Sequence, residues 1–212
     1  MARPRKNSGT PDARERILNS FWTLLGTHRL NEITVGMIVR QAGCNRGTFY
    51  YHFSDMSDLL YCAIEQEVMG ESNLAMDLFN MATGAGEGYR VLSGRRRERF
   101  ALIVHQGGKD EVERAVKAVM LELWKAVLCP DGEELKSEAR MLIEYASSGI
   151  MGVIVYLDSE DDGELDVDAV NERLVDIARF MLSTVAEAQG LTMDELLMRL
   201  KILNNVSRVS QR

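Results

Sequence analysis

The chain has 212 residues, enough to bury a substantial core in one or two domains, and its 46% hydrophobic and 27% charged residues are ordinary for a globular protein. Its three cysteines, without a C-x-x-C spacing, exclude a secreted disulfide framework and a cysteine-based zinc site. The formal net charge of −7 is uneven, because residues 1–60 hold eight Lys and Arg against five Asp and Glu, and the remainder holds 17 against 27. A basic end on an acidic body favours one module that faces a polyanion and a larger part that does not.

The first eleven residues form a short, polar, basic arm that carries Arg3, Arg5 and Lys6. We expect this arm to be disordered when free. No apolar stretch follows it, so it is not a signal peptide, and a cytoplasmic protein is expected. Apolar residues then recur at helical spacing and predict a first helix, from Asp12 to about Thr27, through Ile17, Phe21, Leu24 and Leu25.

Residues 34–53 predict two short helices joined by a tight turn. Thr34 can cap the first helix, because its hydroxyl can accept a hydrogen bond from an unpaired first-turn N–H group. Gly43 follows as a stop signal, since a positive φ costs little only for glycine. Asn45 can cap the second helix in the same way as Thr34 caps the first.

The second of these helices has two different faces. Phe49 and Phe53 lie four residues apart, which places both on the face that packs inward. The side chains left for the other face are polar or aromatic: Arg46, Thr48, Tyr50 and Tyr51. A helix-turn-helix whose second helix exposes such residues is typical of proteins that bind in the DNA major groove.

This block resembles the TetR family of bacterial transcriptional regulators. The resemblance covers roughly residues 12–62 and is carried by Ile33-Thr34-Val35, Ala42-Gly43, the run from Arg46 to Phe53, and Asp58-Leu59-Leu60. It implies an all-α fold with an N-terminal three-helix module. The helix-turn-helix DNA-binding domain and its basic arm are expected at residues 1–55, and a helical ligand-binding and dimerisation domain at residues 56–212.

On this resemblance, Arg46, Gly47 and Thr48 occupy the positions that read bases. Arg46 can donate two hydrogen bonds to a guanine, the Thr48 methyl can contact a thymine, and Tyr50 can reach a base or a phosphate. Gly36 leaves a position of the first helix that can touch DNA without a side chain. The other predicted contacts go to phosphates or the minor groove: Thr34, Tyr51, His52, Arg3, Arg5 and Lys6. The alternative for the arm is a solubilising tail.

Asp55 and Asp58 form a predicted capping arrangement, and a long helix is expected from Ser57 to about Met81. A glycine-rich loop and a helix over residues 91–106 follow. That helix carries a cluster of arginines from Arg95 to Arg99. The cluster can hold an anionic effector or partner, or it can be a solvated face that is paired with nearby glutamates.

A further amphipathic helix ends before Pro130, and the most apolar segment, residues 133–157, comes next. This segment is too short, and too often broken by polar residues, to span a membrane. Another helix is predicted over residues 167–188, and a capping box at Thr192–Glu195 opens a last one. The resemblance implies that the two helices after Pro130 pair with a second subunit, through Ala146, Gly149, Gly152, Val153, Leu174, Ile177 and Met181.

The resemblance also implies an effector pocket between the long helix and the three helices that follow it. The predicted lining is rich in methionine and short of charge: Met69, Met76, Phe79, His105, Met120, Trp124, Met141 and Tyr145. We therefore expect an apolar or amphipathic small molecule. The alternative is that these residues only fill the core.

Nothing in the sequence predicts an enzyme or a cofactor. The three histidines, His28, His52 and His105, lie in different segments, and no nucleophile-elbow, zinc-protease or phosphate-loop motif is present. The acidic residues 158–168 imitate the start of a calcium loop. Ala169 stands where a bidentate glutamate belongs, so no metal site is expected.

These observations predict a homodimeric, sequence-specific transcriptional regulator, and in particular a repressor. An effector in the second domain would shift the long helix, change the spacing of the two recognition helices and lower the affinity for operator DNA. The alternative is a DNA-binding dimer whose C-terminal domain binds a protein partner or only dimerises, with no small-molecule effector. A redox switch at Cys44 is disfavoured, because Arg46 is its only nearby basic activator.

Overall fold

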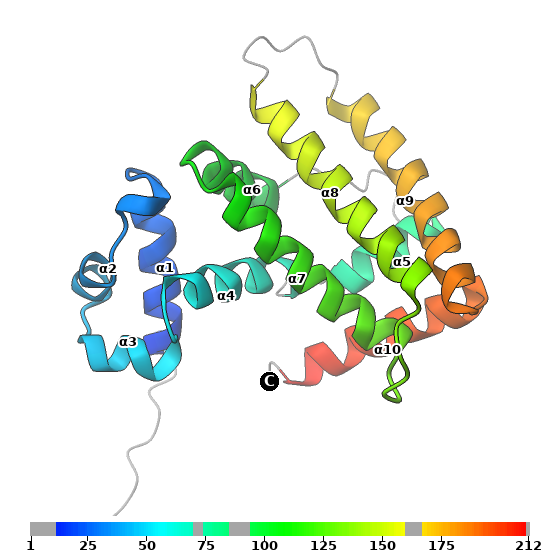
Figure 1. The fold of residues 1–212 in the computed structure, drawn as a ribbon, viewed down its shortest axis with the longest axis horizontal. Helices are drawn as coiled ribbons and strands as arrows, with labels where there is room; N and C mark the ends of the chain where they lie inside the picture. The colour runs from blue at the N-terminus through cyan, green and yellow to red at the C-terminus, as the bar shows by residue number, and fades with distance from the viewer. Residues whose placement is uncertain (1–11, 70–73, 85–93, 160–166, 211–212) are drawn as a thin grey trace, which may run out of the picture.

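The computed structural model describes residues 12–69, 74–84, 94–159 and 167–210. These residues form ten α-helices and one short 3₁₀-helix, η1 (Leu30–Glu32), and contain no β-strand, so the predicted all-α fold is confirmed. The helices are α1 (Ala13–Leu25), α2 (Val35–Ala42), α3 (Arg46–His52), α4 (Met56–Met69), α5 (Leu74–Thr83), α6 (Gly94–His105), α7 (Lys109–Leu128), α8 (Ser137–Ser159), α9 (Val167–Gln189) and α10 (Met193–Ser210). Figure 1 shows α1–α3 gathered at one end of the molecule, with α4 leading from them toward the other helices.

The three N-terminal helices enclose a small apolar core. Ile17 and Phe21 of α1 and Phe49 of α3 are all 0% exposed. The four-residue spacing of Ile17 and Phe21 places both on the inward stripe of α1, as the sequence pattern predicts. The first helix begins where expected, because the Asp12 carboxylate accepts a hydrogen bond from Glu15 N–H at 2.8 Å.

Two helices occupy the stretch for which one long helix is predicted. α4 ends at Met69 and α5 begins at Leu74, and residues 70–73 lie outside the described part of the chain. The predicted start of α4 is confirmed, since the Asp55 carboxylate accepts a hydrogen bond from Asp58 N–H at 2.9 Å. α4 contacts both α5 and α7, and thereby links the N-terminal module to the larger helical group.

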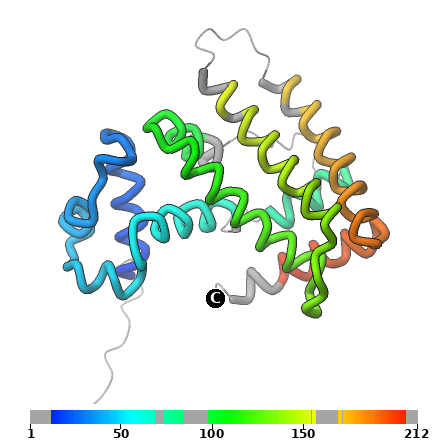
Figure 2. Tube along the Cα trace, viewed as in Figure 1, coloured from blue at the N-terminus to red at the C-terminus, as the bar shows by residue number. Residues whose placement is uncertain are grey.

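The helix α7 is central to this larger group and contacts α4, α6, α8 and α10. Its buried stripe recurs at helical spacing through Val112, Val116, Val119, Leu123 and Val127. α8 and α9 pack side by side, and Figure 2 shows them running next to each other along most of their length. α10 begins with the predicted capping box, in which the Glu195 carboxylate accepts a hydrogen bond from Thr192 N–H at 2.8 Å.

The corner between α6 and α7 touches the N-terminal module. Leu30 N–H in η1 donates a hydrogen bond to the Gln106 carbonyl at 3.0 Å. Gly108 lies so close to Leu30 that a Cβ atom on the glycine would be 2.5 Å from Leu30 Cδ2. Glycine therefore lets the start of α7 pack closely against the segment that leads into α2, and any larger residue would displace the Leu30 side chain.

A second junction is centred on Arg99 of α6. Its guanidinium forms an ion pair with Glu67 of α4 and lies over the Trp22 ring of α1, with 4.4 Å between Cζ and the ring centroid. The Glu67 side chain is only 5% exposed, so the pair is shielded from water. Of the two predictions for the arginine cluster, the pairing with a glutamate is confirmed for Arg99, although this pair does not lie on a solvated face. The side chains of residues 95–97 lie outside the described part.

Two further findings concern the described residues alone. None of their helices is long and apolar enough to cross a membrane. No three of their His, Cys, Asp and Glu side chains come together in a group that could hold a metal ion. Residues 160–166, which make up most of the acidic segment compared with a calcium loop, lie outside the description.

Candidate DNA-binding surface

The helix α2 begins and ends where its sequence signals predict. The Thr34 hydroxyl accepts a hydrogen bond from Met37 N–H at 3.3 Å, so the predicted N-cap is confirmed. At the other end, Gly43 has φ = 62°, the left-handed conformation that closes a helix. Arg16 Nε of α1 donates a hydrogen bond to the Ala42 carbonyl at 3.2 Å and ties this end of α2 to α1.

The N-terminus of α3 is organised by Asn45, as predicted. Its side-chain oxygen accepts hydrogen bonds from Thr48 N–H at 2.8 Å and from the Thr48 hydroxyl at 3.2 Å. A Cβ atom on Gly47 would lie 3.1 Å from the same oxygen, which is tighter than most Cβ contacts. Glycine at position 47 therefore leaves the Asn45 cap uncrowded. This is a structural explanation for the glycine, in addition to the predicted close approach of the helix to DNA.

One face of α3 is buried and the opposite face is open. Phe49 and Phe53 are 0% and 1% exposed, and their ring centroids lie 5.7 Å apart, so the predicted inward face is confirmed. Arg14 of α1 lies over the Phe53 ring. Tyr50 and Tyr51 are 56% and 84% exposed. Large aromatic side chains on an open face mark a surface that is available to a partner.

Arg46, the first residue of α3, lies next to the start of α2. Its Nη2 atom is 3.6 Å from the position that a Cβ atom on Gly36 would take, and Thr34 Oγ1 is 3.8 Å from that position. The guanidinium therefore shares one surface with the first turn of α2. Because Gly36 has no side chain, the Arg46 guanidinium has room to lie against the first turn of α2. The sequence alone does not show that Gly36 and Arg46 are neighbours.

The predicted DNA contacts that the structure describes lie at the start of α2 and along α3. Five of them are exposed, namely Thr34, Arg46, Gly47, Tyr50 and Tyr51, and two are half-buried, namely Thr48 and His52. The arm residues Arg3, Arg5 and Lys6 lie outside the described residues. The contacts of all these residues with DNA stay predictions.

The predicted effector lining is divided between buried and exposed positions. Met120 and Trp124 of α7 are 8% and 6% exposed and belong to the core. Met141 and Tyr145 of α8 are instead 63% and 71% exposed, so they are surface residues of the monomer. Of the other members, Met76 and Phe79 are half-buried and His105 is exposed. The side chain of Met69 lies outside the description.

Exposed apolar residues form a stripe along α8. At 3.6 residues per turn, five positions fall within about 80° of the helix circumference: Met141, Tyr145, Gly149, Gly152 and Tyr156. Their aromatic members are open, with Tyr156 51% exposed. A Cβ atom on either glycine would meet nothing within 4 Å. We call these five residues the α8 stripe.

The neighbouring helix α9 also presents large apolar side chains, since Ile177 and Phe180 are 56% and 67% exposed. Of the predicted dimer contacts, Gly149, Gly152 and Ile177 are exposed. The others are half-buried: Ala146, Val153, Leu174 and Met181. Tyr156 and Phe180 are absent from the predicted set, although the four-residue spacing from Gly152 to Tyr156 is a signal that the sequence contains.

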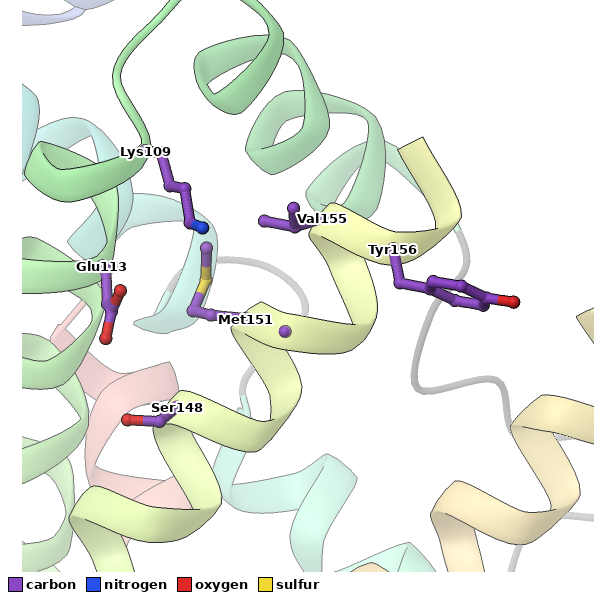
Figure 3. A pocket seen from close by; sticks show the side chains of 7 residues that line it. Lys109, Glu113, Ser148, Met151, Val155 and Tyr156 are labelled. Carbon is purple, nitrogen blue, oxygen red and sulfur yellow. The ribbon is translucent and has the colours of Figure 1, made fainter. Parts of the chain in front are cut away.

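A cleft of about 400 Å³ lies between the start of α7 and the second half of α8. Its lining residues are Lys109, Glu113, Ser148, Met151, Gly152, Val155 and Tyr156. None of them belongs to the predicted pocket. The charged and hydroxyl-bearing members do not stand out in an apolar pattern, and the others lie on a helix that is apolar nearly all round. Figure 3 shows Lys109 and Glu113 facing Ser148, Met151 and Val155 across the cleft, while Tyr156 points away from them.

Comparison with known proteins agrees with the reading of the N-terminal module. Residues 17–61 match the family model for "Bacterial regulatory proteins, tetR family". No curated protein matches the sequence.

Three of the solved structures that match this chain are as follows. A tetR-family transcriptional regulator from Streptomyces coelicolor has 14% identity and a TM-score of 0.39, with 96% of this chain and 100% of that chain covered. The TetR family repressor AlkX from Dietzia sp. has 16% identity and a TM-score of 0.36, with 85% and 100% covered. AmtR from Mycobacterium smegmatis has 17% identity and a TM-score of 0.33, with 89% and 99% covered.

Proposed function

We propose that this chain acts as a homodimeric repressor that a small-molecule effector releases from its operator. The premise is that the chain carries the DNA-binding domain of the TetR family of bacterial regulatory proteins and is a DNA-binding transcriptional regulator. The observation that carries this proposal is the open face of α3. Its tyrosines are exposed while its phenylalanines are buried, so the helix is both anchored and available. A recognition helix needs both properties to enter the major groove.

The proposed base contacts begin at Arg46. A guanidinium forks onto the O6 and N7 atoms of guanine, and the adjacent surface of α2 lets the side chain extend along the groove wall. Tyr50 lies four residues later, on the same open face. Tyr51 and Thr34 flank these two and suit contacts to phosphates, which fix the register of the helix on the duplex.

The proposed dimer uses the α8 stripe and the exposed residues of α9. Side chains as open as Tyr145 and Phe180, 71% and 67% exposed, are costly to leave in water over a contiguous surface. A two-fold axis that packs the α8 stripe of one subunit against the α8 stripe of its partner buries both copies of the stripe at once. The two recognition helices of such a dimer then face one side of the duplex.

Effector release requires a route from the larger helical group to α3. Two contacts support such a route: the Arg99 junction between α1, α4 and α6, and the contact of Leu30 with Gln106 and Gly108. A ligand that prefers one arrangement of α6 and α7 therefore biases the position of the N-terminal module, and the coupling is reciprocal.

The proposal is tested by selecting genomic fragments that the purified protein binds, followed by footprinting on the enriched site. We expect a pseudo-palindrome whose half-sites lie about one helical turn, or a multiple of it, apart. Protection of a single asymmetric half-site by a monomer would contradict the dimeric mode of binding.

Replacing Arg46 or Tyr50 with alanine is expected to weaken binding to the selected site by about 1–3 kcal/mol for each lost base contact. The thermal stability should change little, because both side chains are exposed and opposite the buried face of α3. Fluorescence anisotropy with specific and random duplexes measures the effect. Lys125→Ala, on the distant α7, is the matched control and should leave the affinity unchanged.

A further inference from the structure

The cleft between α7 and α8 is lined by one cation and one anion, Lys109 and Glu113, and within the described part of the chain only the anion is paired. Among the described residues, Lys109 forms no hydrogen bond or ion pair, whereas Glu113 is paired with Lys117 at 2.7 Å. The ammonium of Lys117, hydrogen-bonded to Glu113, lowers the pKa of that carboxyl, so the carboxylate stays ionised and occupied. Asp110 and Glu111 follow Lys109 in the chain but do not line the cleft. Lys109 contributes to the same lowering of the Glu113 pKa through its charge, but its ammonium forms no ion pair with any residue that the structure describes and keeps its hydrogen-bond donors for a ligand.

The opposite wall combines one small polar group with an apolar floor. Ser148 forms no hydrogen bond among the described residues and turns its hydroxyl into the cleft (Figure 3). Met151 is 3% exposed, and Val155 stands beside it on α8. A volume of about 400 Å³ lies within the range of small-molecule sites. A ligand that satisfies all these groups has one negative charge at one end and a compact apolar body.

We infer that this cleft is the effector site and that its ligand is a small amphipathic carboxylate. The carboxylate accepts charge-assisted hydrogen bonds from the Lys109 ammonium and a further hydrogen bond from the Ser148 hydroxyl. The apolar body lies against Met151 and Val155. The effector class expected from the sequence is thereby narrowed to an anion. Its proposed site is the α7–α8 cleft, in place of the pocket expected between the long helix and the three helices that follow it.

The position of Lys109 connects this cleft to the DNA-binding module. Its neighbour Gly108 packs directly against Leu30, and Leu30 N–H is bonded to the Gln106 carbonyl. Leu30 belongs to η1, which leads into α2 through Ile33 and Thr34. A ligand that draws Lys109 toward α8 moves the first turn of α7, and the tightly packed corner transmits that movement to α2. This step, unlike the binding site itself, rests on the proposed function.

The first test needs no DNA. The full-length protein is labelled at its methionine methyl groups for NMR. It is titrated with straight-chain carboxylates from butanoate to decanoate and with phenylacetate. The ligand concentration reaches about 10 mM, which is above the roughly 1 mM Kd of a weak site. Met151→Leu identifies the reporting signal. We expect at least one carboxylate to shift the Met151 methyl signal, with affinity at least about tenfold higher than that of its uncharged amide.

Lys109→Met keeps the length of the side chain and removes its charge, and it should lower the affinity for that carboxylate at least about tenfold. Lys125→Met, on the same helix and outside the cleft, should leave the affinity unchanged. The inference is overturned if no carboxylate shifts the Met151 signal, or if the acid and its amide bind the wild type and Lys109→Met equally well.

The second test uses the DNA site found by genomic selection. The carboxylate should lower the affinity of the wild type for that site and should not affect Lys109→Met. If no DNA is selected, the proposed function fails, while the binding result in the cleft still stands. If DNA binds and the carboxylate occupies the cleft without changing its affinity, the cleft is a binding site but not the effector site, and the inference is wrong.

Discussion

Replacing Arg99 with methionine is expected to destabilise the fold by about 3 kcal/mol, the low end of the cost of removing one partner from a buried ion pair, because the Arg99 side chain is itself 18% exposed. The Glu67 side chain is 5% exposed, so losing the guanidinium leaves its carboxylate in a poorly hydrated place without the cation that pairs with it. The Trp22 ring loses a stacked cation at 4.4 Å in the same step. Urea unfolding at one fixed protomer concentration measures the change, since a dimer's stability depends on concentration.

Two companion variants separate charge from packing. Arg99→Lys keeps the charge but loses the planar group that can both fork and stack, and it should fall between the wild type and Arg99→Met. Arg99→Met combined with Glu67→Met removes both charges and should recover much of the lost stability. A loss of less than about 1 kcal/mol for Arg99→Met would mean that the pair behaves as a surface salt bridge, contrary to its burial.

The helix-turn-helix could be predicted from sequence because its signals are local. Thr34, Gly43 and Asn45 act on backbone groups within three or four residues of themselves, and each cap forms as expected. Phe49 and Phe53 face inward because their spacing matches the helix period. These inferences require only that the helices form, and not that any distant part of the chain is correctly placed.

The junctions could not be predicted, because their partners are far apart in the sequence. Arg99 and Glu67 are 32 positions apart, and Leu30 and Gly108 come from different parts of the chain. An arginine cluster can hold an anionic effector or partner, or it can be a solvated face paired with glutamates, and the sequence pattern alone leaves both possibilities open. Only the packing of α1, α4 and α6 decides between them for Arg99.

The assignment of faces on α8 was ambiguous for a different reason. A helix that is apolar nearly all round has no single inward stripe, so periodicity does not identify which side meets its own domain. Met141 and Tyr145 were therefore placed with the pocket residues, although both are exposed in the monomer. The cleft was missed because its charged and hydroxyl groups come from two helices, at positions that an apolar pattern passes over.

The glycines of the α8 stripe provide the second large effect, because the monomer and the proposed dimer make opposite demands on them. In the monomer, a Cβ atom on Gly149 or Gly152 would touch nothing within 4 Å. Leucine at both positions should therefore be accommodated, and each change should stabilise the helix by up to about 1 kcal/mol, since glycine is a poor helix former. In the proposed dimer, the same side chains would hold the partner's helix away.

We therefore expect Gly149→Leu with Gly152→Leu to leave a folded, helical monomer that has lost operator binding. A monomer binds only one half-site, so it loses the avidity that a dimer gains from binding two half-sites at once. The affinity for the operator should therefore fall by about 10²- to 10⁴-fold, although neither glycine lies near α3. Gly149→Leu alone separates this effect from the cleft, because Gly152 lines the cleft and Gly149 does not.

Sedimentation velocity with circular dichroism is the measurement, and Gly149→Ala with Gly152→Ala is the graded control. A double-leucine variant that still sediments as a dimer and binds the operator would place the subunit contact on another surface, with the exposed Ile177 and Phe180 of α9 the next to be tested.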